Sequence, residues 1–177
     1  MEPAAKGRWY AIGSVLLTAL IVLIHPGFSP PQNARTSDLK WLRLTEGLET
    51  AKKGKKKVLV DVYTDWCGWC KKMDADVYSD AGVKKYLKDK YVLVKMDAES
   101  AGKVEYAGEQ LSEAELSAEF GVRGYPTTIF LLPNGDPITL LPGYVQADNF
   151  LSVLTYIGED HYQKMKYDEF LAKQNSN

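Results

Sequence analysis

The chain has 177 residues, of which 45% are hydrophobic and 25% are charged, and this length suits one globular domain with an appendage. Lysine and arginine number 22 against 23 aspartates and glutamates, so the near-neutral charge gives no electrostatic case for a nucleic-acid partner. The only cysteines, Cys67 and Cys70, lie three positions apart, which excludes a framework of structural disulfides.

The chain begins with a segment that has the layout of an export signal. Lys6 and Arg8 precede an apolar run at 9–24, and Pro26 follows the run. The basic start predicts that everything after Pro26 is translocated. The run is long for a signal core and short for a bilayer span, so residues 1–26 fit either a cleaved signal peptide or an anchor in the inner membrane. We expect an exported protein, periplasmic or outward-facing, that meets the membrane only through this segment.

Residues 27–37 are rich in proline and small polar residues and are predicted to form a linker before a single domain at 38–158. Ser37 or Asp38 can cap a first helix that ends at Gly54. The helix is indicated by apolar residues at roughly helical spacing. These residues are Leu39, Leu42, Leu48 and Ala51.

Strands and helices are predicted to alternate after this helix. Residues 58–63 are dense in β-branched and aromatic side chains, which indicates a central strand covered on both faces. Residues 71–90 have helical composition, and Asp80 can cap a restart of the helix. A second strand is predicted at 91–96, and the polar stretch at 97–108 is expected to be irregular.

A capping box and a hairpin signal organise the next part of the chain. Ser112 and Glu115 have the spacing of a capping box, which predicts a helix that runs to Phe120. Strands are predicted at 127–132 and 137–141, because the Asn-Gly pair between them is a strong hairpin signal.

A helix at 148–157 is predicted to close the domain, and residues 159–177 form a polar, partly helical tail. Helices that alternate with strands and end in a hairpin plus a helix predict an α/β fold. The expected architecture is a three-layer α/β/α sandwich with a central mixed sheet.

The cysteine pair has the pattern of a redox site. Cys67 follows the predicted central strand and opens a helix, where unpaired backbone N–H groups and the helix dipole stabilise a thiolate. A Cys-x-x-Cys helix opening lowers the pKa of the first thiol, so Cys67 is predicted to be the attacking nucleophile. Cys70 lies one turn further on and is predicted to resolve the mixed disulfide. A loop this short would stabilise the fold very little, which favours catalysis over a structural crosslink.

Metal and haem chemistry are disfavoured by the residues that the chain lacks. A zinc site needs four ligands, and beyond the two cysteines the chain offers only His25 and His161. Covalent haem attachment needs a histidine after the second cysteine, where Lys71 stands. We therefore expect neither a metal nor a cofactor.

Two motifs resemble landmarks of the thioredoxin superfamily. The stretch 60–71, which ends in Trp-Cys-Gly-Trp-Cys-Lys, is similar to its active-site strand and turn, and 121–127 is similar to a loop with a cis proline that packs against the disulfide. Exported thioredoxin-like proteins with a Trp-Cys-x-x-Cys-Lys motif resemble the chain most, and so does the C-terminal domain of the membrane reductase DsbD. The resemblance covers about 38–158 and implies a thioredoxin fold and a thiol-disulfide oxidoreductase.

The resemblance also assigns catalytic roles to two charged residues. Asp61 matches the family's buried acid, which accepts a proton from the resolving cysteine, and burial in an apolar strand should raise its pKa. An ordinary aspartate at an edge or a strand end is the alternative. Lys95, on the next strand, matches a lysine near that acid, and it either pairs with Asp61 or is solvated.

Five residues are expected to bind substrate. A cis Pro126 has no N–H and leaves the Tyr125 backbone free to pair with an extended substrate. Trp66 and Trp69 flank the cysteines; Trp66 is expected to pack within the domain, and Trp69 is the better candidate for partner recognition. Gly68 completes the set inside the motif. Trp69 replaces the proline of thioredoxin's Cys-Gly-Pro-Cys, which leaves the direction of electron flow open.

Three functions are compatible with these residues. The first is a monomeric reductase that reduces disulfides in other exported proteins and takes electrons from a membrane thiol-disulfide donor. The second is a disulfide oxidase or isomerase. The third is a non-enzymatic thioredoxin-like binding module, which would have no need for the intact Cys67, Cys70, Asp61 and Pro126.

Overall fold

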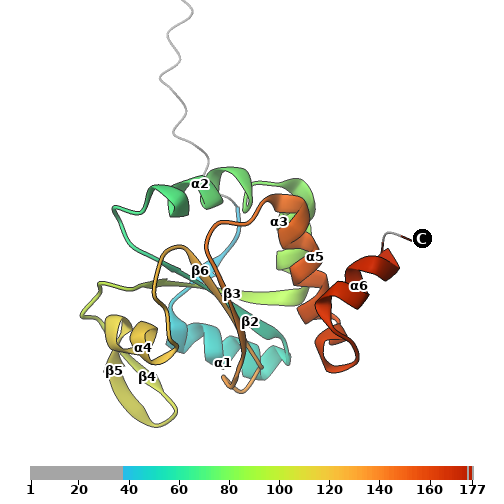
Figure 1. Cartoon of the computed structure of the whole chain (residues 1–177). Coiled ribbons are helices and arrows are strands. Elements are labelled where there is room, and N and C mark those ends of the chain that lie inside the picture. The colour runs from blue at the N-terminus through green and yellow to red at the C-terminus, as the bar shows by residue number, and fades with distance from the viewer. Residues whose placement is uncertain (1–37, 175, 177) are drawn as a thin grey trace, which may run out of the picture. The chain divides into compact units, whose positions relative to one another are not determined.

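The computed structural model describes residues 38–174 and residue 176, and their centre is a five-stranded mixed sheet (Figure 1). The strand order is β1-β3-β2-β6-β7. The first three strands in this order are parallel, and β6 and β7 run antiparallel to their neighbours. The strands are β1 (Trp41–Leu42), β2 (Lys57–Tyr63), β3 (Tyr91–Asp97), β6 (Thr127–Leu131) and β7 (Pro137–Pro142).

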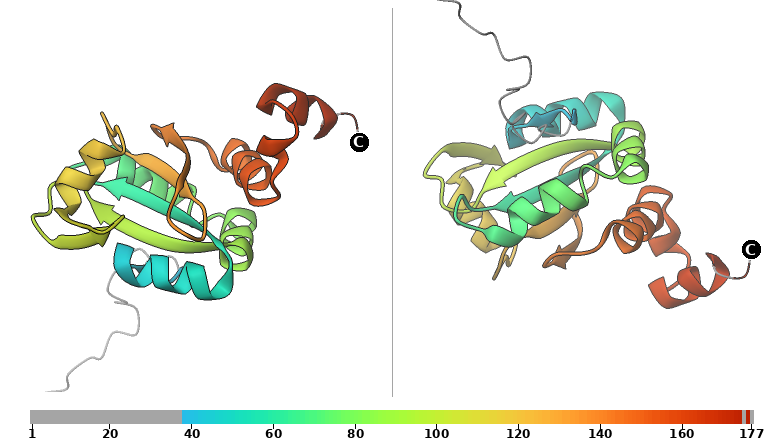
Figure 2. Two further views of the ribbon diagram at one scale, coloured as in Figure 1. Left: turned by 90° about the horizontal axis from the view of Figure 1, so that it is seen from below. Right: turned by 90° about the horizontal axis from the view of Figure 1, so that it is seen from above.

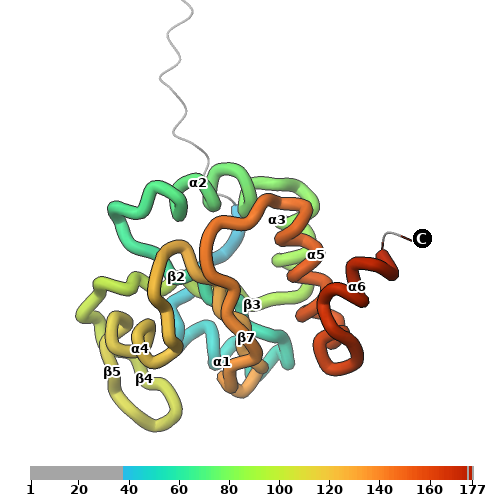
Figure 3. The backbone as a smooth tube through the Cα atoms, in the orientation of Figure 1, coloured from blue at the N-terminus to red at the C-terminus, as the bar shows by residue number. Residues whose placement is uncertain are grey.

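Helices cover both faces of this sheet (Figure 2). One core cluster joins the sheet to α1 and α4, and a second joins its other face to α2, α3 and α5. The helices are α1 (Leu44–Gly54), α2 (Gly68–Asp76), α3 (Ala81–Lys90), α4 (Glu113–Glu119) and α5 (Ala147–Gly158). The predicted three-layer sandwich is therefore confirmed, and the backbone tube in Figure 3 follows the chain through the layers.

The central strand β2 is buried on both faces, as its composition predicts. Val58, Val60 and Val62 face the cluster that includes α1, and Leu59 faces the cluster that includes α2, α3 and α5. Successive side chains of a strand point to opposite faces. Asp61 therefore lies on the same face as Leu59, under the helices that follow the cysteines.

The predicted helix at 38–54 is wrong in its first part. Residues 41–42 form β1, and α1 begins only at Leu44. Leu39 is buried in the cluster under α2, α3 and α5, whereas Leu42 is buried in the cluster under α1. In an extended chain, residues three positions apart can reach opposite faces of the sheet in this way. Asp38 does not cap this helix; its carboxylate instead accepts a hydrogen bond from Lys88 of α3 (2.5 Å).

Part of the stretch expected to be irregular, 97–108, belongs to a hairpin instead. Strands β4 (Lys103–Tyr106) and β5 (Glu109–Ser112) pair antiparallel. Ala107 and Gly108 connect them with φ values of 52° and 85°, as the two central residues of a tight hairpin turn require. Alanine rarely adopts this conformation. The Ala-Gly pair at this turn therefore does not predict a hairpin, whereas the Asn-Gly pair between β6 and β7 does.

The other local signals are confirmed. The Ser112 hydroxyl accepts from the Glu115 N–H (3.1 Å), and the Glu115 carboxylate accepts from the Ser112 N–H (2.7 Å), which completes the capping box. Asp80 caps α3 by accepting from the Val83 N–H (2.9 Å). Gly135 has a φ of 99° in the turn between β6 and β7.

Two helical segments lie in the tail. It contains the short 3-10 helix η1 (His161–Gln163) and α6 (Tyr167–Gln174), and the Tyr156 hydroxyl of α5 donates to the Met165 carbonyl (2.6 Å). The expected signal or anchor at 1–26 and the linker at 27–37 lie outside the described residues. In the described part of the chain, no helix combines the length and apolar character needed to cross a membrane.

Gly47 is predicted to be essential for packing α1 on the sheet. A Cβ at this position would lie 2.3 Å from Cγ2 of Val94 on β3, and a β-branched valine has little freedom to move away. Gly47→Ala is expected to lower the free energy of unfolding by about 1–3 kcal/mol, measured by urea denaturation of the full-length chain. Gly54→Ala is the matched control, since its nearest contact would be Lys56 Cγ at 3.9 Å. Equal stability of the two variants would contradict this packing argument.

Candidate active site

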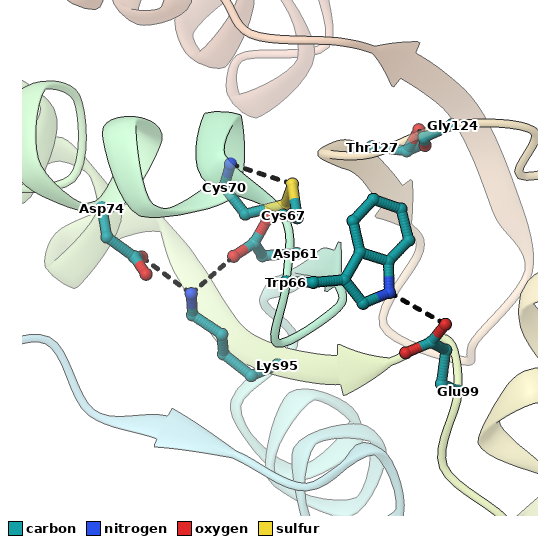
Figure 4. Close-up of a disulfide and its surroundings, with 9 residues drawn as sticks. All are labelled: Asp61, Trp66, Cys67, Cys70, Asp74, Lys95, Glu99, Gly124 and Thr127. Atoms are coloured by element: carbon teal, nitrogen blue, oxygen red, sulfur yellow. Dashed lines mark hydrogen bonds and ion pairs between the residues drawn. A yellow bond between two sulfur atoms is a disulfide. The ribbon is translucent and has the colours of Figure 1, made fainter.

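The cysteine pair forms a disulfide at the start of α2 (Figure 4). Cys67 is the N-cap residue of the helix, and the Cys70 N–H donates to Cys67 Sγ at 3.0 Å. The two residues are 4% and 5% exposed. After reduction, the same N–H group and the helix dipole would stabilise a thiolate on Cys67. This geometry agrees with the predicted role of Cys67 as the nucleophile and places Cys70 one turn behind it.

Strand register brings Asp61 and Lys95 together behind the disulfide. Asp61 of β2 lies opposite Lys95 of the parallel strand β3, and Lys95 Nζ is 2.8 Å from Asp61 Oδ2. Asp61 is 2% exposed and has strands on both sides. Asp61 is therefore not at an edge or a strand end, and Lys95 pairs with it instead of being solvated.

Burial and pairing act on the pKa values of both groups. Burial raises the pKa of Asp61, and the charge of Lys95 offsets part of this rise. Burial alone would lower the pKa of Lys95. The charge of Asp61, together with the hydrogen bonds that Lys95 donates to Asp61 and Asp74, raises this pKa overall. A carboxyl whose pKa lies above its usual range can accept and return a proton closer to neutral pH.

The sequence did not predict the other groups around Lys95. Asp74 of α2 binds Lys95 Nζ through Oδ1 at 2.7 Å. Its spacing of four residues from Cys70 could have indicated this, because such residues share a helix face. Three aromatic rings also surround Lys95 Nζ, with centroids at 5.1, 5.2 and 5.7 Å. These rings belong to Trp41, Tyr63 and Tyr78.

Two exposed tryptophans flank the disulfide. Trp66 is 66% exposed, so the expectation that it packs within the domain is wrong. Its indole N–H donates to Glu99 (2.9 Å), and its ring meets Tyr125 edge-on at 6.0 Å, which holds it at the surface. Trp69 is 57% exposed and lies 5.3 Å from the ring of Tyr144. Apolar surface is thus available on both sides of the cysteines.

The predicted loop with a cis proline is present. The Tyr125–Pro126 peptide is cis, and the Thr127 hydroxyl donates to the Gly124 carbonyl at 2.8 Å, closing the loop around it (Figure 4). Gly68 is the first residue of α2. The substrate-binding roles of Trp66, Gly68, Trp69, Tyr125 and Pro126 stay predictions.

A groove of about 770 Å³ begins at Trp69 and runs between α2 and the loop before α5. It is lined by aromatic and polar side chains, and its one charged pair, Lys72 with Asp76, is neutral overall. The residues around it include Tyr144, Gln146 and Asn149. In the part of the chain that the structure describes, no group of three or more His, Cys, Asp or Glu side chains is placed to hold a metal ion.

Proteins that combine this fold with a cysteine pair at the helix after the central strand are thiol-disulfide oxidoreductases. A family model described as a thioredoxin-like domain matches residues 44–158. The chain belongs to this thioredoxin-like family.

Comparisons with individual proteins agree with this assignment. The thiol:disulfide interchange protein DsbD of Vibrio vulnificus strain YJ016 is 29% identical over 160 residues, which cover 82% of this chain and 25% of that protein. The DsbD of Yersinia enterocolitica is 31% identical over 163 residues, which cover 85% and 26%. The chain thus spans about a quarter of the length of these curated relatives.

Two solved structures share the fold. A thioredoxin-fold protein from Helicobacter pylori superposes with a TM-score of 0.57 at 26% identity and covers 73% of this chain and 90% of its own. A thioredoxin from Thermus thermophilus gives a TM-score of 0.55 at 26% identity, with coverages of 67% and 86%.

The raised pKa of Asp61 predicts a pH-dependent gain in stability for Asp61→Asn. The pKa is higher in the folded state than in the unfolded state. The free energy of unfolding of wild type, relative to that of the variant, is therefore highest below about pH 4. Wild type then loses stability as the pH rises through the folded-state pKa, so the advantage of the variant should grow over that range. Urea denaturation of the oxidised full-length chain from pH 4 to 9 measures this difference.

The matched control for this experiment is Asp65→Asn, a substitution at an exposed position in the loop before Cys67. It removes a charge without changing the solvation of the core. An Asp61→Asn advantage that stays constant or shrinks with rising pH would contradict the assignment of a raised pKa.

Proposed function

We propose that this protein is an exported reductase that uses the Cys67–Cys70 pair to reduce disulfides of other exported proteins. The observation that carries this chemistry is the buried Asp61 behind the resolving cysteine, and the reducing direction is proposed from the similarity to thioredoxin and to DsbD. An acid that takes the proton of Cys70 assists the step in which the cysteine ring closes and the substrate leaves reduced. The similarity to thioredoxin and to DsbD supports the same chemistry.

The first step forms a mixed disulfide. The Cys67 thiolate attacks one sulfur of the substrate disulfide, the substrate S–S bond breaks, and the second substrate sulfur leaves as a thiolate that takes up a proton. The Cys70 N–H and the start of α2 stabilise the attacking thiolate.

The second step releases the substrate. The Asp61 carboxylate accepts the proton of Cys70, and the resulting thiolate attacks Cys67 Sγ. The bond between Cys67 and the substrate breaks, the Cys67–Cys70 disulfide forms, and the substrate sulfur that was bonded to Cys67 leaves as a thiolate. Two electrons have then passed to the substrate, and a thiol-disulfide donor must return two electrons to the protein.

The surface around the disulfide suits an extended protein substrate. Trp66 and Trp69 offer apolar contacts on its two sides, and large exposed aromatic side chains are frequent anchors in protein interfaces. The groove next to Trp69 extends this surface. Backbone pairing with Tyr125 would then orient the substrate disulfide toward Cys67.

Export and membrane proximity complete the proposal. The basic residues Lys6 and Arg8, with the apolar run at 9–24, support translocation of the domain as a cleaved or anchored form. A membrane thiol-disulfide protein is the electron donor that best fits an exported domain, since the thiol pool of the cytoplasm does not reach it. The protein is proposed to act as a monomer.

The reduction potential tests the direction of electron flow. The Cys67–Cys70 couple is expected to lie near the value of thioredoxin, about −270 mV. It is measured by equilibrating the full-length chain in mild detergent with defined thiol-disulfide buffers. A potential near the roughly −120 mV of a strong oxidant would reject the reductase and identify a disulfide donor.

Serine variants of the two cysteines test catalysis against pure binding. Cys67→Ser is expected to lose at least about 100-fold in the rate of disulfide reduction, because it removes the nucleophile. Cys70→Ser should make the first attack and accumulate a covalent complex with a disulfide substrate, which non-reducing gel electrophoresis detects. Full function in the Cys67→Ser variant would instead identify a binding module.

A further inference from the structure

Three buried polar oxygen atoms meet behind the active site. Asp61 Oδ1, the Tyr78 hydroxyl and the Thr128 hydroxyl are inaccessible to solvent, and within the described part of the chain none has a partner at full hydrogen-bond geometry. Tyr78 and Thr128 are 0% exposed. Buried polar groups that have no protein partner usually indicate a functional contact or a bound water.

The fold brings these three groups together from three elements. Thr128 of β6 lies directly opposite Asp61 in the antiparallel pairing with β2. Phe130, two residues further along the same face of β6, packs in the cluster with α2, α3 and α5, so Thr128 faces these helices too. Tyr78 lies in the turn between α2 and α3, and its ring packs edge-on against Trp41 (5.0 Å) and Phe150 (5.9 Å). The ring is therefore held in place, and the hydroxyl has little freedom to seek another partner.

Tyr78 lies beside the acid, because its ring centroid is 5.7 Å from Lys95 Nζ and this atom is 2.8 Å from Asp61 Oδ2. Burial, followed by the charge of Asp61, raises the pKa of Tyr78 well above its usual value, so the hydroxyl keeps its proton and is a donor. In return, the Tyr78 hydroxyl acts to lower the pKa of Asp61, against the larger effect of burial. Thr128 can donate to the Tyr78 oxygen in the same way.

We propose that Tyr78 is a positioning residue for proton transfer, in which its hydroxyl donates to Asp61 Oδ1 directly or through one water molecule. Lys95 Nζ already lies 2.8 Å from Asp61 Oδ2, so each of the two carboxylate oxygens would then have its own donor. Thr128 donates to the Tyr78 oxygen and fixes the direction of the phenol O–H bond. Without this use, the Tyr78 hydroxyl would only cost stability, because phenylalanine fills the same space without burying a polar group.

The consequence for the reaction is a more readily ionised Asp61. The titratable groups that face this carboxyl are Lys95 from β3, Asp74 from α2, Tyr78 and the resolving Cys70. Tyr78 and Lys95 favour the carboxylate, which is the form that can accept a proton from Cys70. The inference rests on the proposed role of Asp61 as that acceptor, and it does not depend on the direction of electron flow.

The test is a direct titration of the Asp61 carboxyl. The oxidised full-length chain is labelled with ¹³C-aspartate, and the Asp61 signal is assigned by its loss in Asp61→Asn. Tyr78→Phe is expected to raise the pKa of Asp61 by about 0.5 to 1 unit, the effect of one hydrogen bond to a carboxylate. Thr128→Val should shift it in the same direction by a smaller amount.

Tyr91→Phe is the matched control, because Tyr91 is also a buried tyrosine but donates to the Leu154 carbonyl (2.8 Å) at the opposite end of β3. It should leave the Asp61 titration unchanged within about 0.2 unit. An unchanged or lowered Asp61 pKa in Tyr78→Phe would overturn the proposal, and the same result in Thr128→Val would do so if the first variant did not fold.

A second measurement follows the reaction itself, and comparing it with the NMR titration separates this inference from the proposed function. In single-turnover experiments, the pH profile for release of the mixed disulfide should move to higher pH in Tyr78→Phe by the same amount as the carboxyl titration. The NMR titration needs no substrate. It therefore stands or falls independently of whether the protein reduces or oxidises its partners in the cell.

Discussion

A carboxylate in the middle of a buried strand is stable only when other groups replace the water that it has lost. In this protein, that carboxylate is Asp61, and Lys95 Nζ meets it at 2.8 Å. Much of the site follows from this constraint. The parallel register of β2 and β3 sets the two residues opposite each other, and Asp74 from α2 binds the same ammonium group. The helix that carries the cysteines is thereby tied to the strand that carries the acid.

The site has a buried part around Asp61 and an exposed part around the two tryptophans. On the inside, buried charges and hydroxyls set the proton affinity of Asp61 under a disulfide that is itself almost inaccessible. On the outside, Trp66 and Trp69 expose large apolar surfaces beside the same disulfide. In the proposed reaction, a partner contacts the tryptophans at the surface, and proton transfer takes place in a low-dielectric interior where each hydrogen bond to the carboxylate has a larger effect.

Lys95 shows why buried charge pairs demand a complete environment. Its ammonium group has carboxylates on two sides and the rings of Trp41, Tyr63 and Tyr78 around the remainder. Aromatic faces attract cations without competing for the same hydrogen bonds. The lysine is thus restrained in one position beside Asp61.

The sequence by itself determined the α/β fold, the central strand, the capping box, the hairpin at Asn-Gly and the identity of Cys67 and Cys70 as candidates. These features depend on local chemistry, such as apolar runs, cap residues and the spacing of the cysteine pair, and a single segment reveals them. The family resemblance supplied Asp61 and Pro126 as further candidates. The misplaced start of the first helix shows the limit, since Leu39 and Leu42 fit a helical spacing and a strand equally well.

Only the tertiary structure decided how the distant segments meet. The register of β2 and β3 sets Lys95 opposite Asp61, so Lys95 is paired and not solvated. The register of β2 and β6 places Thr128 on the other side of Asp61. Packing of the turn after α2 brought in Tyr78, and β1 brought in Trp41, although neither residue carries a motif. Exposure of Trp66 was likewise settled by its hydrogen bond to Glu99, 33 residues away. Such contacts depend on the relative positions of whole elements, which local sequence patterns do not encode.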